Sequence, residues 1–590
     1  MANTVSVIEK PIPEKVSKDA YVLGIQDNGS GQQALYRLPL GEVRANGAND
    51  LFIIPALIAQ YGTKQALTVF INANIEYDNL TAIVDRFFKA AASAVTKTYG
   101  SQFYRYNTSN TPLGTKTGDN AGLNCTPSTI ASPGTDDYAD LPLFACFDIN
   151  YIIDSTSLEP VIIAIKDVYG AFTSTPTDSL VGVLQMTGWV RRSGDTTTKT
   201  VEYRAQQAAG FKPLPEGVKI DGSVRGFVIH AKYAAGYNTA GKLSSISGVQ
   251  PATLRPGSSG STSISHNGQI SLWRAWGDQY GGSSLCDIAF MQLMLEIKYA
   301  NLGNAAVMSG CRSYYYGYAA AVSEESVKRI VLTVAQANSL IVGSRVSVGT
   351  SASREKATCY DVHDIATISS IEDVTINNTA YKAVYLATES SFNVEAATTY
   401  ITTHPWLTGS TDSVPGNDGS PYSNTNGKEP FKIQGIETML GMYEALGCTT
   451  LYEDTEKYTV YENRKAAEIA SNGSGTNPVT LGTIPKEEAA AWKYNAELNW
   501  DENNQEAYMI PTLFAGGSTT GYRSATYRDA AATTGWREWL ALGILNCGGY
   551  CGLACASLNG GLGTASWYFG ARASGTSGNR GEYTAAQAAV

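Results

Sequence analysis

The segment Gly535–Arg572 restricts the possible folds of this chain more than any other. It holds three tryptophans, three cysteines and nine glycines within 38 residues, and this mixture fits neither a helical nor a strand pattern. Glycine at this density permits tight turns that require a positive φ. Tyr550, Trp567 and Tyr568 are large, stiff side chains that can bind a partner at little entropic cost. We expect a folded scaffold that displays a contact surface; the alternative is a Gly-rich end of a core with a structural role alone.

The length and composition favour a large assembly protein. A chain of 590 residues is too long for one core, so several domains are expected. Charged residues make up only 16% of the chain, and 35 tyrosines stand against 15 phenylalanines. Tyrosine is amphipathic and suits surfaces that contact other molecules. This composition is typical of long-lived assemblies and extracellular β-proteins.

Charge and hydropathy exclude several classes of function. The net charge is −10 and no basic cluster is present, so we expect no nucleic-acid binding. No apolar run is long enough to span a bilayer, and the first residues lack the apolar region of a secretory signal. The nine cysteines are scattered apart from Cys547, Cys551 and Cys555, which argues against a disulfide framework. We therefore expect synthesis in a cytosol and, for any role outside the cell, release inside a particle.

Residues 1–45 predict a hairpin. Strand patterns at Ser17–Asp27 and Gln33–Leu40 flank the turn signal Asn28–Gly31. Because an isolated hairpin is not stable in water, we expect it to dock on a partner. The sequence DAYVLGIQDNG…ALYRLPLGEV resembles the N-terminal segment that joins bacteriophage fibre and virion proteins to the particle. The alternative is an ordinary edge hairpin. The resemblance implies that the attachment residues are Tyr21, Leu23, Ile25, Tyr36 and Leu38.

Residues 46–215 predict an α+β domain. Thr68–Ile75 reads as a strand, and Leu80–Ala94 carries one apolar face at helical spacing. Further strands are expected near residues 143–153, 161–168 and 180–191. Acidic residues between 136 and 148 match no metal-binding loop and are interpreted as solvated loop acids.

Residues 216–322 contain the strongest helix signal of the chain. A strand is expected at 224–233, and a helix at Ser284–Leu302, capped by Ser283 or Ser284 with Asp287 in its first turn. The sequence GGSSLCDIAFMQLMLEIKYANLGNAAVMSGC resembles a segment of predicted phage structural proteins.

Residues 323–403 predict an inserted β-module, because short β-branched runs alternate with turn residues. Zinc binding by Cys359 and His363 is not expected, since a second ligand pair is missing.

In residues 404–590, we expect Phe431–Tyr443 to pack on the 284–302 helix. Ala507–Pro511 is expected to form a strand, and Ala573–Val590 a disordered tail.

The segment Met509–Arg572 resembles the C-type-lectin-fold variable proteins that retroelements diversify, and related phage receptor-binding tips. The matching pieces are a Trp-rich strand at 536–545, a Gly/Asn-rich loop at 546–566 and a closing strand at 567–572. Calcium-dependent sugar binding through this loop is not expected, because no acid lies between Glu538 and Arg572. The resemblance implies receptor-contact residues at Asn546, Tyr550, Ala554, Ser557, Asn559, Trp567 and Tyr568.

The resemblance also gives a fold class. We expect an α+β, β-rich, multidomain chain with an N-terminal anchor hairpin, an α+β domain and a C-type-lectin-like domain. That last domain would be formed by residues 216–322 and 404–590, interrupted by the β-module at 323–403. Its helix would be the one at 284–302.

Catalysis is not expected. The chain has four histidines and none has the sequence context of a catalytic base. Formylglycine-generating enzymes share the lectin-like fold and use C-terminal cysteines, but the residues around Cys547, Cys551 and Cys555 do not match that family. No metal or cofactor is expected.

These observations lead to one functional hypothesis. The chain is expected to be a bacteriophage fibre or receptor-binding subunit, a homotrimer in the virion. Residues 1–45 would hold it to other virion proteins, and its lectin-like tip would bind a glycan or protein on the bacterial surface. The first alternative is a capsid or tail decoration protein without receptor binding. The second is a tailspike glycan hydrolase, which would need a pair of carboxylates.

Overall fold

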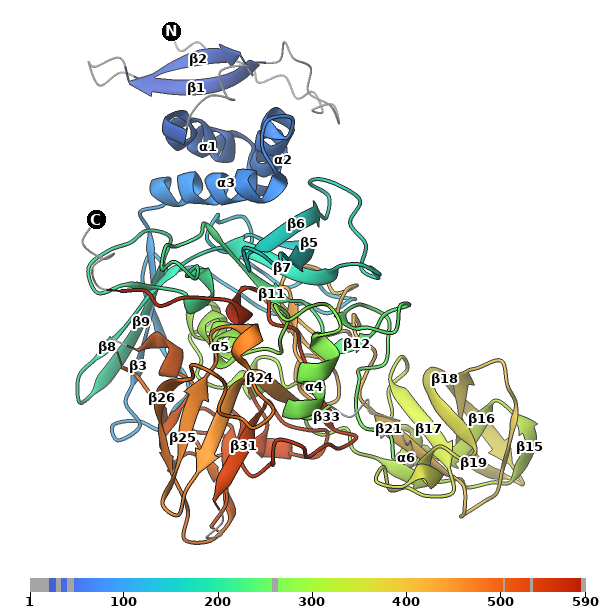
Figure 1. Cartoon of the computed structure of the whole chain (residues 1–590). Coiled ribbons are helices and arrows are strands. Elements are labelled where there is room, and N and C mark those ends of the chain that lie inside the picture. Colours follow the sequence, from blue (N-terminus) through green and yellow to red (C-terminus); the bar gives the residue numbers. More distant parts are fainter. Residues whose placement is uncertain are drawn as a thin grey trace.

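Helix α5 (Leu285–Tyr299) lies at the centre of the main body of the molecule (Figure 1). Ser284 caps the helix, and the Asp287 carboxylate accepts the Ser284 backbone N–H at 2.9 Å, which confirms the predicted helix and cap. The helix is buried on every side, and Glu296 and Lys298 are buried with the rest. Each of these two charges has a buried partner of opposite sign.

The structure describes residues 21–27, 33–39, 47–256, 264–501, 504–530 and 534–584. Strands take up 34% of the chain and helices 17%, so the predicted β-rich, multidomain α+β class is confirmed.

Two antiparallel sheets flank α5: a five-stranded sheet packs beside it, and a four-stranded sheet lies between it and the N-terminal helices (Figure 1). The five-stranded sheet has the order β10-β8-β9-β3-β4, and the four-stranded sheet has the order β11-β7-β5-β6. Because β11 pairs with β7, the second sheet crosses the boundary expected between residues 215 and 216. The strands are β3 (Thr98–Tyr104), β4 (Thr115–Gly118), β5 (Cys146–Ile153), β6 (Pro160–Ile165), β7 (Leu180–Met186), β8 (Trp189–Gly194), β9 (Thr198–Arg204), β10 (Lys212–Pro213) and β11 (Phe227–Ala231).

The strand expected at 180–191 is divided between these two sheets. It ends at Met186, and β8 begins at Trp189 in the other sheet. Gly188 lies at the change of direction, where an added Cβ would overlap the ring of Tyr203. The chain can make this close approach only without a side chain.

Three helices stack between the hairpin and the sheets (Figure 1): α1 (Gly47–Tyr61), α2 (Thr63–Asn74) and α3 (Leu80–Ala94). Helix α3 confirms the prediction. The strand expected at Thr68–Ile75 is wrong, because this segment belongs to α2. Leu67, Phe70 and Ile71 are fully buried, so helical packing against α1 and α3 overrides the β-branched composition.

The N-terminal hairpin forms as predicted, from β1 (Tyr21–Asp27) and β2 (Gln33–Pro39). Their antiparallel register places Gly24 opposite Tyr36 and Val22 opposite Leu38. The side chains of the expected attachment residues lie outside the described part of the structure; these residues are Tyr21, Leu23, Ile25, Tyr36 and Leu38.

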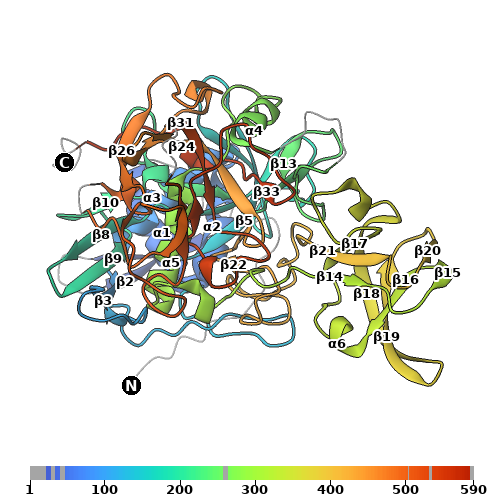
Figure 2. The same ribbon diagram turned by 90° about the horizontal axis from the view of Figure 1, so that it is seen from below.

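The β-module projects from one side of the body and has its own hydrophobic core (Figures 1 and 2). Its six-stranded sheet has the order β14-β21-β17-β18-β19-β16, beside the pair β15-β20. The elements are β14 (Gly317–Ala319), β15 (Glu324–Val327), β16 (Arg329–Thr333), α6 (Val334–Ala337), β17 (Arg345–Gly349), β18 (His363–Ile376), β19 (Thr379–Ala387), β20 (Phe392–Val394) and β21 (Tyr400–His404).

An eight-stranded sheet lies on the side of α5 away from the hairpin (Figure 1). Its order is β26-β25-β24-β31-β32-β30-β27, and β33 pairs with β24 in parallel. The strands are β24 (Tyr443–Glu453), β25 (Lys457–Glu462), β26 (Val479–Pro485), β27 (Ala491–Tyr494), β30 (Ala525–Arg528), β31 (Gly535–Ala541), β32 (Ala556–Ser557) and β33 (Phe569–Gly570).

Helix α4 (His266–Trp273) and three short strand pairs complete these elements. The pairs are β12 (Ala235–Tyr237) with β13 (Leu243–Ser245), β22 (Lys432–Ile433) with β23 (Ile436–Glu437), and β28 (Glu497–Leu498) with β29 (Pro511–Leu513). Strand β22 packs against α5, as expected for the segment Phe431–Tyr443.

Two expectations for the C-terminal part are wrong. The segment Ala507–Pro511 is not a strand: a 3-10 turn ends at Ala507, and β29 begins only at Pro511. The tail expected from Ala573 onward is ordered through much of its length, with Ser577 and Arg580 almost fully buried. Ser577 donates a hydrogen bond to Asp287 at 2.7 Å, so polar contacts with α5 hold a segment that lacks large apolar side chains.

Helix α5 and the segment 536–572 share one hydrophobic core. Leu285, Ile288 and Leu293 belong to the same buried cluster as Trp539 and Phe569. A lectin-like domain split by the β-module requires this shared core.

Candidate functional site

The candidate site is built on one face of the eight-stranded sheet. Side chains directly opposite each other on paired strands point to the same face. Trp492 on β27 lies opposite Tyr527 on β30. Ser557 on β32 lies opposite Tyr527 on one side and Leu540 of β31 on the other. These four residues form one row across four neighbouring strands.

A second aromatic group flanks this row. Tyr443 on β24 is paired with Phe569 on β33. Tyr443 also lies two residues before Ala445, the partner of Leu540, which places it on the same face of the sheet. The ring of Tyr568 lies 5.0 Å from that of Phe569 and 5.9 Å from that of Tyr443. Aromatic rings therefore lie on both sides of β31 and β32.

The loop after β31 covers the row. It begins at Gly543, whose φ is +105° and where an added Cβ would overlap the Cys551 sulfur. The Ile544 backbone N–H donates to Cys547 Sγ at 3.1 Å. Tyr550 stacks on Trp492 with the centroids 5.4 Å apart and the planes 10° from parallel. Glycine turns and this stacked pair hold the loop over the sheet, as its composition predicts.

The sheet and the loop enclose an open pocket of about 390 Å³. This volume is within the range of small-molecule sites, and a lining of hydrophobic and aromatic side chains with a few polar groups is typical of them. The lining residues are Tyr443, Trp492, Tyr527, Leu540, Ile544, Asn546, Cys547, Tyr550, Ser557, Asn559, Tyr568 and Phe569.

Five of the seven expected contact residues line this pocket. They are Asn546, Tyr550, Ser557, Asn559 and Tyr568. Asn546, Tyr550 and Asn559 are exposed, and the Ser557 hydroxyl donates to Asn559 Oδ1 at 3.0 Å.

The other two expected contact residues are buried elsewhere, so their assignment to a contact surface is wrong. Ala554 is 6% exposed and belongs to the core of the body. Trp567 is 4% exposed and belongs to the hydrophobic cluster of the β-module, where its indole N–H donates to Glu355 at 2.9 Å. Burial of the large apolar surface of the indole is favourable, so this side chain fixes the module to the body.

Sequence reasoning missed seven lining residues. Four of them lie within the glycine-rich segment: Leu540, Ile544, Cys547 and Phe569. Tyr443, Trp492 and Tyr527 come from strands that lie before this segment in the sequence. The only local signal is the spacing of Trp492 and Tyr494, which places two aromatic rings on the same face of one strand. Sheet pairing, which the sequence does not specify, brings them to the loop.

The described residues that line the pocket include no charged side chain. Burial raises the pKa of Tyr443, so its hydroxyl stays protonated. Hydrogen bonds from the Cys551 side chain and from the Ile544 N–H lower the pKa of Cys547, whereas burial raises the pKa of Cys551. The lining thus offers amide and hydroxyl groups beside aromatic rings, and one thiol without a neighbouring base.

A cluster of possible metal ligands lies elsewhere, in the core of the body. The ligand atoms of Cys125, Asp136 and Asp418 lie within 4.8 Å of one another. The ammonium group of Lys298 lies 3.1 Å from the Asp136 carboxylate and 2.7 Å from that of Asp418. This buried lysine supplies the positive charge that the carboxylates need, so we assign no metal to the cluster.

A second cluster combines serine, cysteine and histidine. Ser347 Oγ lies 2.9 Å from His404 Nε2 and 3.2 Å from Cys359 Sγ, within the β-module. All three side chains are buried, and burial holds the pKa of His404 well below its usual value. The cluster is a polar contact inside a core, closed to a substrate. Cys359 lies beside His404 rather than beside His363. The His363 ring instead shares a hydrogen bond with the Thr388 hydroxyl.

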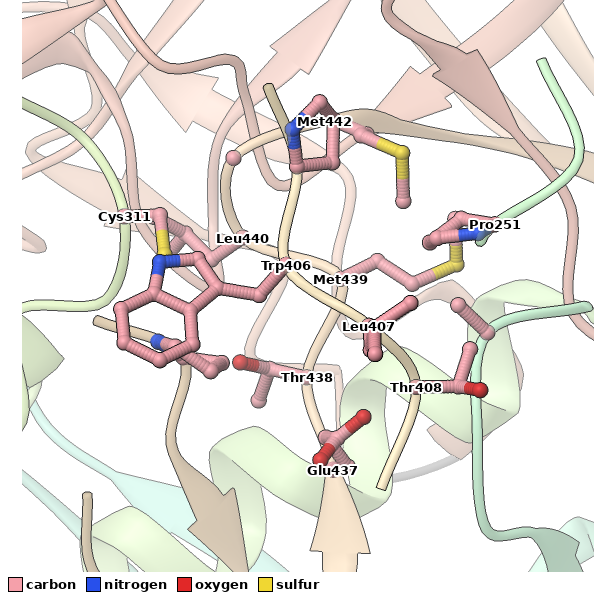
Figure 3. Close-up of a pocket in the computed structure, with 14 residues that line it drawn as sticks. Pro251, Cys311, Trp406, Leu407, Thr408, Glu437, Thr438, Met439, Leu440 and Met442 are labelled. Atoms are coloured by element: carbon pink, nitrogen blue, oxygen red, sulfur yellow. The ribbon is translucent and has the colours of Figure 1, made fainter. Parts of the chain in front are cut away.

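Two other cavities fit a ligand less well. One of about 30 Å³ lies where the β-module meets the body, lined by Trp406, Met439 and the Glu437 side chain (Figure 3). This volume suits about one water molecule. Another of about 280 Å³ lies near the C-terminus, where the charges of Arg464 and Glu506 are paired with each other at 3.0 Å.

No helix in the described ranges is both long and apolar enough to cross a membrane. No protein-family model matches the chain, and a search of curated proteins finds no match.

Proposed function

We propose that this chain is a bacteriophage virion protein, a fibre or receptor-binding subunit that attaches the particle to the host cell. Residues 1–45 hold it to other virion proteins. Residues 216–322 and 404–590 form a C-type-lectin-like domain, and the aromatic pocket of this domain binds a receptor on the bacterial surface.

One observation carries the proposal. Five side chains chosen as receptor contacts from the glycine-rich segment line a single open pocket, together with aromatic residues from three other strands. The sheet that carries this pocket lies on the side of α5 away from the N-terminal hairpin (Figure 1). A protein anchored at its hairpin would therefore present this sheet away from the particle.

The chemistry of the pocket supports binding rather than hydrolysis. A glycan hydrolase of the tailspike type needs two carboxylates at the scissile bond, and the described lining residues provide none. Weak binding at one pocket becomes strong adhesion when a trimer, or many trimers on one particle, engage the same surface.

Adsorption of particles with point substitutions tests the proposal. Deletion of residues 536–590 is unsuitable, because this segment contributes β31, β32 and the buried Arg580 to the core. We expect Tyr550→Ala particles to assemble normally and to lose adsorption to host cells. Tyr104→Ala is the matched control, since Tyr104 is an exposed tyrosine of β3 in a different sheet.

Normal adsorption by Tyr550→Ala and Trp492→Ala particles would instead favour a decoration protein without receptor binding. Failure of the chain to appear in purified particles would contradict the virion assignment itself.

A further inference from the structure

The size of the pocket limits its occupant. A volume of about 390 Å³ accommodates a small molecule or the end of a chain, not a flat protein surface. Its walls are fixed by strand pairing, from Trp492 through Tyr527 and Ser557 to Leu540. The site is therefore a preformed recess.

The aromatic lining suits a ring that has both apolar faces and polar edges. Aromatic faces carry negative charge density and attract the slightly positive C–H groups of such a ring. Tyr527 and Tyr568 bring such rings from opposite sides of β31 and β32. The C–H faces of a pyranose can pack on them.

The polar groups of the pocket match sugar hydroxyls. A side-chain amide both donates and accepts hydrogen bonds, as each sugar hydroxyl does. The amide of Asn546 is exposed and makes no hydrogen bond with any described residue, and Asn559 uses only its Oδ1, toward Ser557. Two exposed amides are thus available among the aromatic rings that line the pocket.

The absence of charge among the described lining residues selects against ionic ligands. A carboxylate or phosphate group entering the pocket would lose water without gaining a cationic partner. A quaternary ammonium group needs several ring faces turned toward one point. Trp492 and Tyr550 cover one face of each other at 10° from parallel, so they do not form such a cage.

The geometry points to a neutral saccharide as the ligand: a short uncharged glycan segment that stacks on the aromatic rings and is hydrogen-bonded by Asn546 and Asn559. Binding requires no calcium, because the described lining contains no carboxylate. This inference rests on the proposed receptor-binding function and names the chemical class of the receptor.

The full-length protein should be titrated with neutral oligosaccharides of glucose, galactose, mannose and N-acetylglucosamine. Sialyllactose serves as the anionic probe and choline as the cationic one, with and without EDTA. Saturation-transfer NMR and the change in the total tryptophan fluorescence report on binding. We expect at least one neutral oligosaccharide to bind with unchanged affinity in EDTA. Binding of sialyllactose or choline alone would overturn the inference.

Variants locate the binding. Tyr550→Ala and Asn546→Ala should each weaken saccharide binding by about tenfold, the loss expected for one aromatic contact or one good hydrogen bond. Both side chains are exposed, so the variants should fold; Tyr104→Ala should bind like the wild type. Equal binding by all three variants would place the saccharide elsewhere and overturn the inference.

The same variants separate this inference from the proposed function. If Tyr550→Ala abolishes adsorption while no neutral saccharide binds the wild type, the receptor is not a neutral glycan and only the inference fails. If Tyr550→Ala loses saccharide binding but its particles adsorb normally, the saccharide site stands and the receptor-binding role fails.

Discussion

Single buried charges join segments that lie far apart in the sequence. Arg580, fully buried near the C-terminus, donates to Glu506 at 3.0 Å and lies 3.4 Å from Glu462 of β25. Burying such a group is costly unless its charge is compensated, so each partner depends on the other. The last described segment of the chain is thereby tied to the eight-stranded sheet.

Replacing this arginine should strongly destabilise the body. Arg580→Met leaves Glu462 without its cation and Glu506 with Arg464 alone, and we expect a loss of about 3–5 kcal/mol in the free energy of unfolding. The measurement is urea unfolding followed by tryptophan fluorescence. Lys64→Met is the control, because the Lys64–Asp167 pair is exposed and should contribute less than about 1 kcal/mol. Equal losses in the two variants would contradict this account.

Glu538 makes the stability of the protein depend on pH. Burial raises the pKa of Glu538 to about 8, and its Oε1 has no hydrogen-bond partner among the described residues. The folded state therefore favours the protonated form. The stabilisation is fully present below the ordinary glutamate pKa, near 4.3, and is lost as the pH rises through the folded-state value of about 8.

Glu538→Gln should remove this dependence. In the pH window between about 4.5 and 8, the wild type should lose roughly 1.4 kcal/mol per pH unit relative to the variant. Urea unfolding at pH 5, 6.5 and 8 measures the difference. Parallel stability curves for the two proteins would show that Glu538 is ionised in the fold.

At the scale of elements, the β-module resembles an independent unit. The chain enters it at β14 and leaves it at β21, and these strands pair, with Tyr318 opposite Ile401. Its core is separate from that of the body, apart from Cys311, Leu545 and Trp567, which the body contributes. The two ends of the module thus meet at one place, as in an inserted domain.

We expect residues 314–406 to fold alone, because the paired end strands and the separate core are retained in this fragment. Circular dichroism should show β structure, and Trp406 fluorescence should report one cooperative unfolding transition. The fragment should be less stable than the module within the full chain, since the buried indole of Trp567 is absent. A fragment without a cooperative transition would mean that the module depends on the body for its fold.

At the scale of the whole molecule, the main core separates the N-terminal hairpin from the pocket of the eight-stranded sheet. The hairpin and helices α1 to α3 lie on one side of α5, the eight-stranded sheet lies on the other, and the module projects laterally (Figures 1 and 2). In a virion, this arrangement would leave the pocket and the module free of the N-terminal attachment. Homotrimer formation remains part of the proposal, and light scattering on the purified full-length chain would measure it.

Much of the local structure could be predicted from short-range patterns. The Ser284–Asp287 cap, the apolar face of 80–94 and the pairing of the first two strands each depend on a few neighbouring residues. Thr68–Ile75 shows where such patterns fail. Its β-branched residues favour a strand in isolation, but burial between α1 and α3 is worth more than this preference.

The sequence by itself determined which residue types are available to the candidate site: glycines that allow the turns of the loop, amide side chains, and no acid between Glu538 and Arg572. Only the tertiary structure decided which aromatic residues meet there. Strand pairing brought Tyr443, Trp492 and Tyr527 to the loop and withdrew Trp567 into the module. The physical reason is that pairing and burial are contacts between distant segments, whose free energy depends on the whole core and leaves no signal in the neighbouring residues.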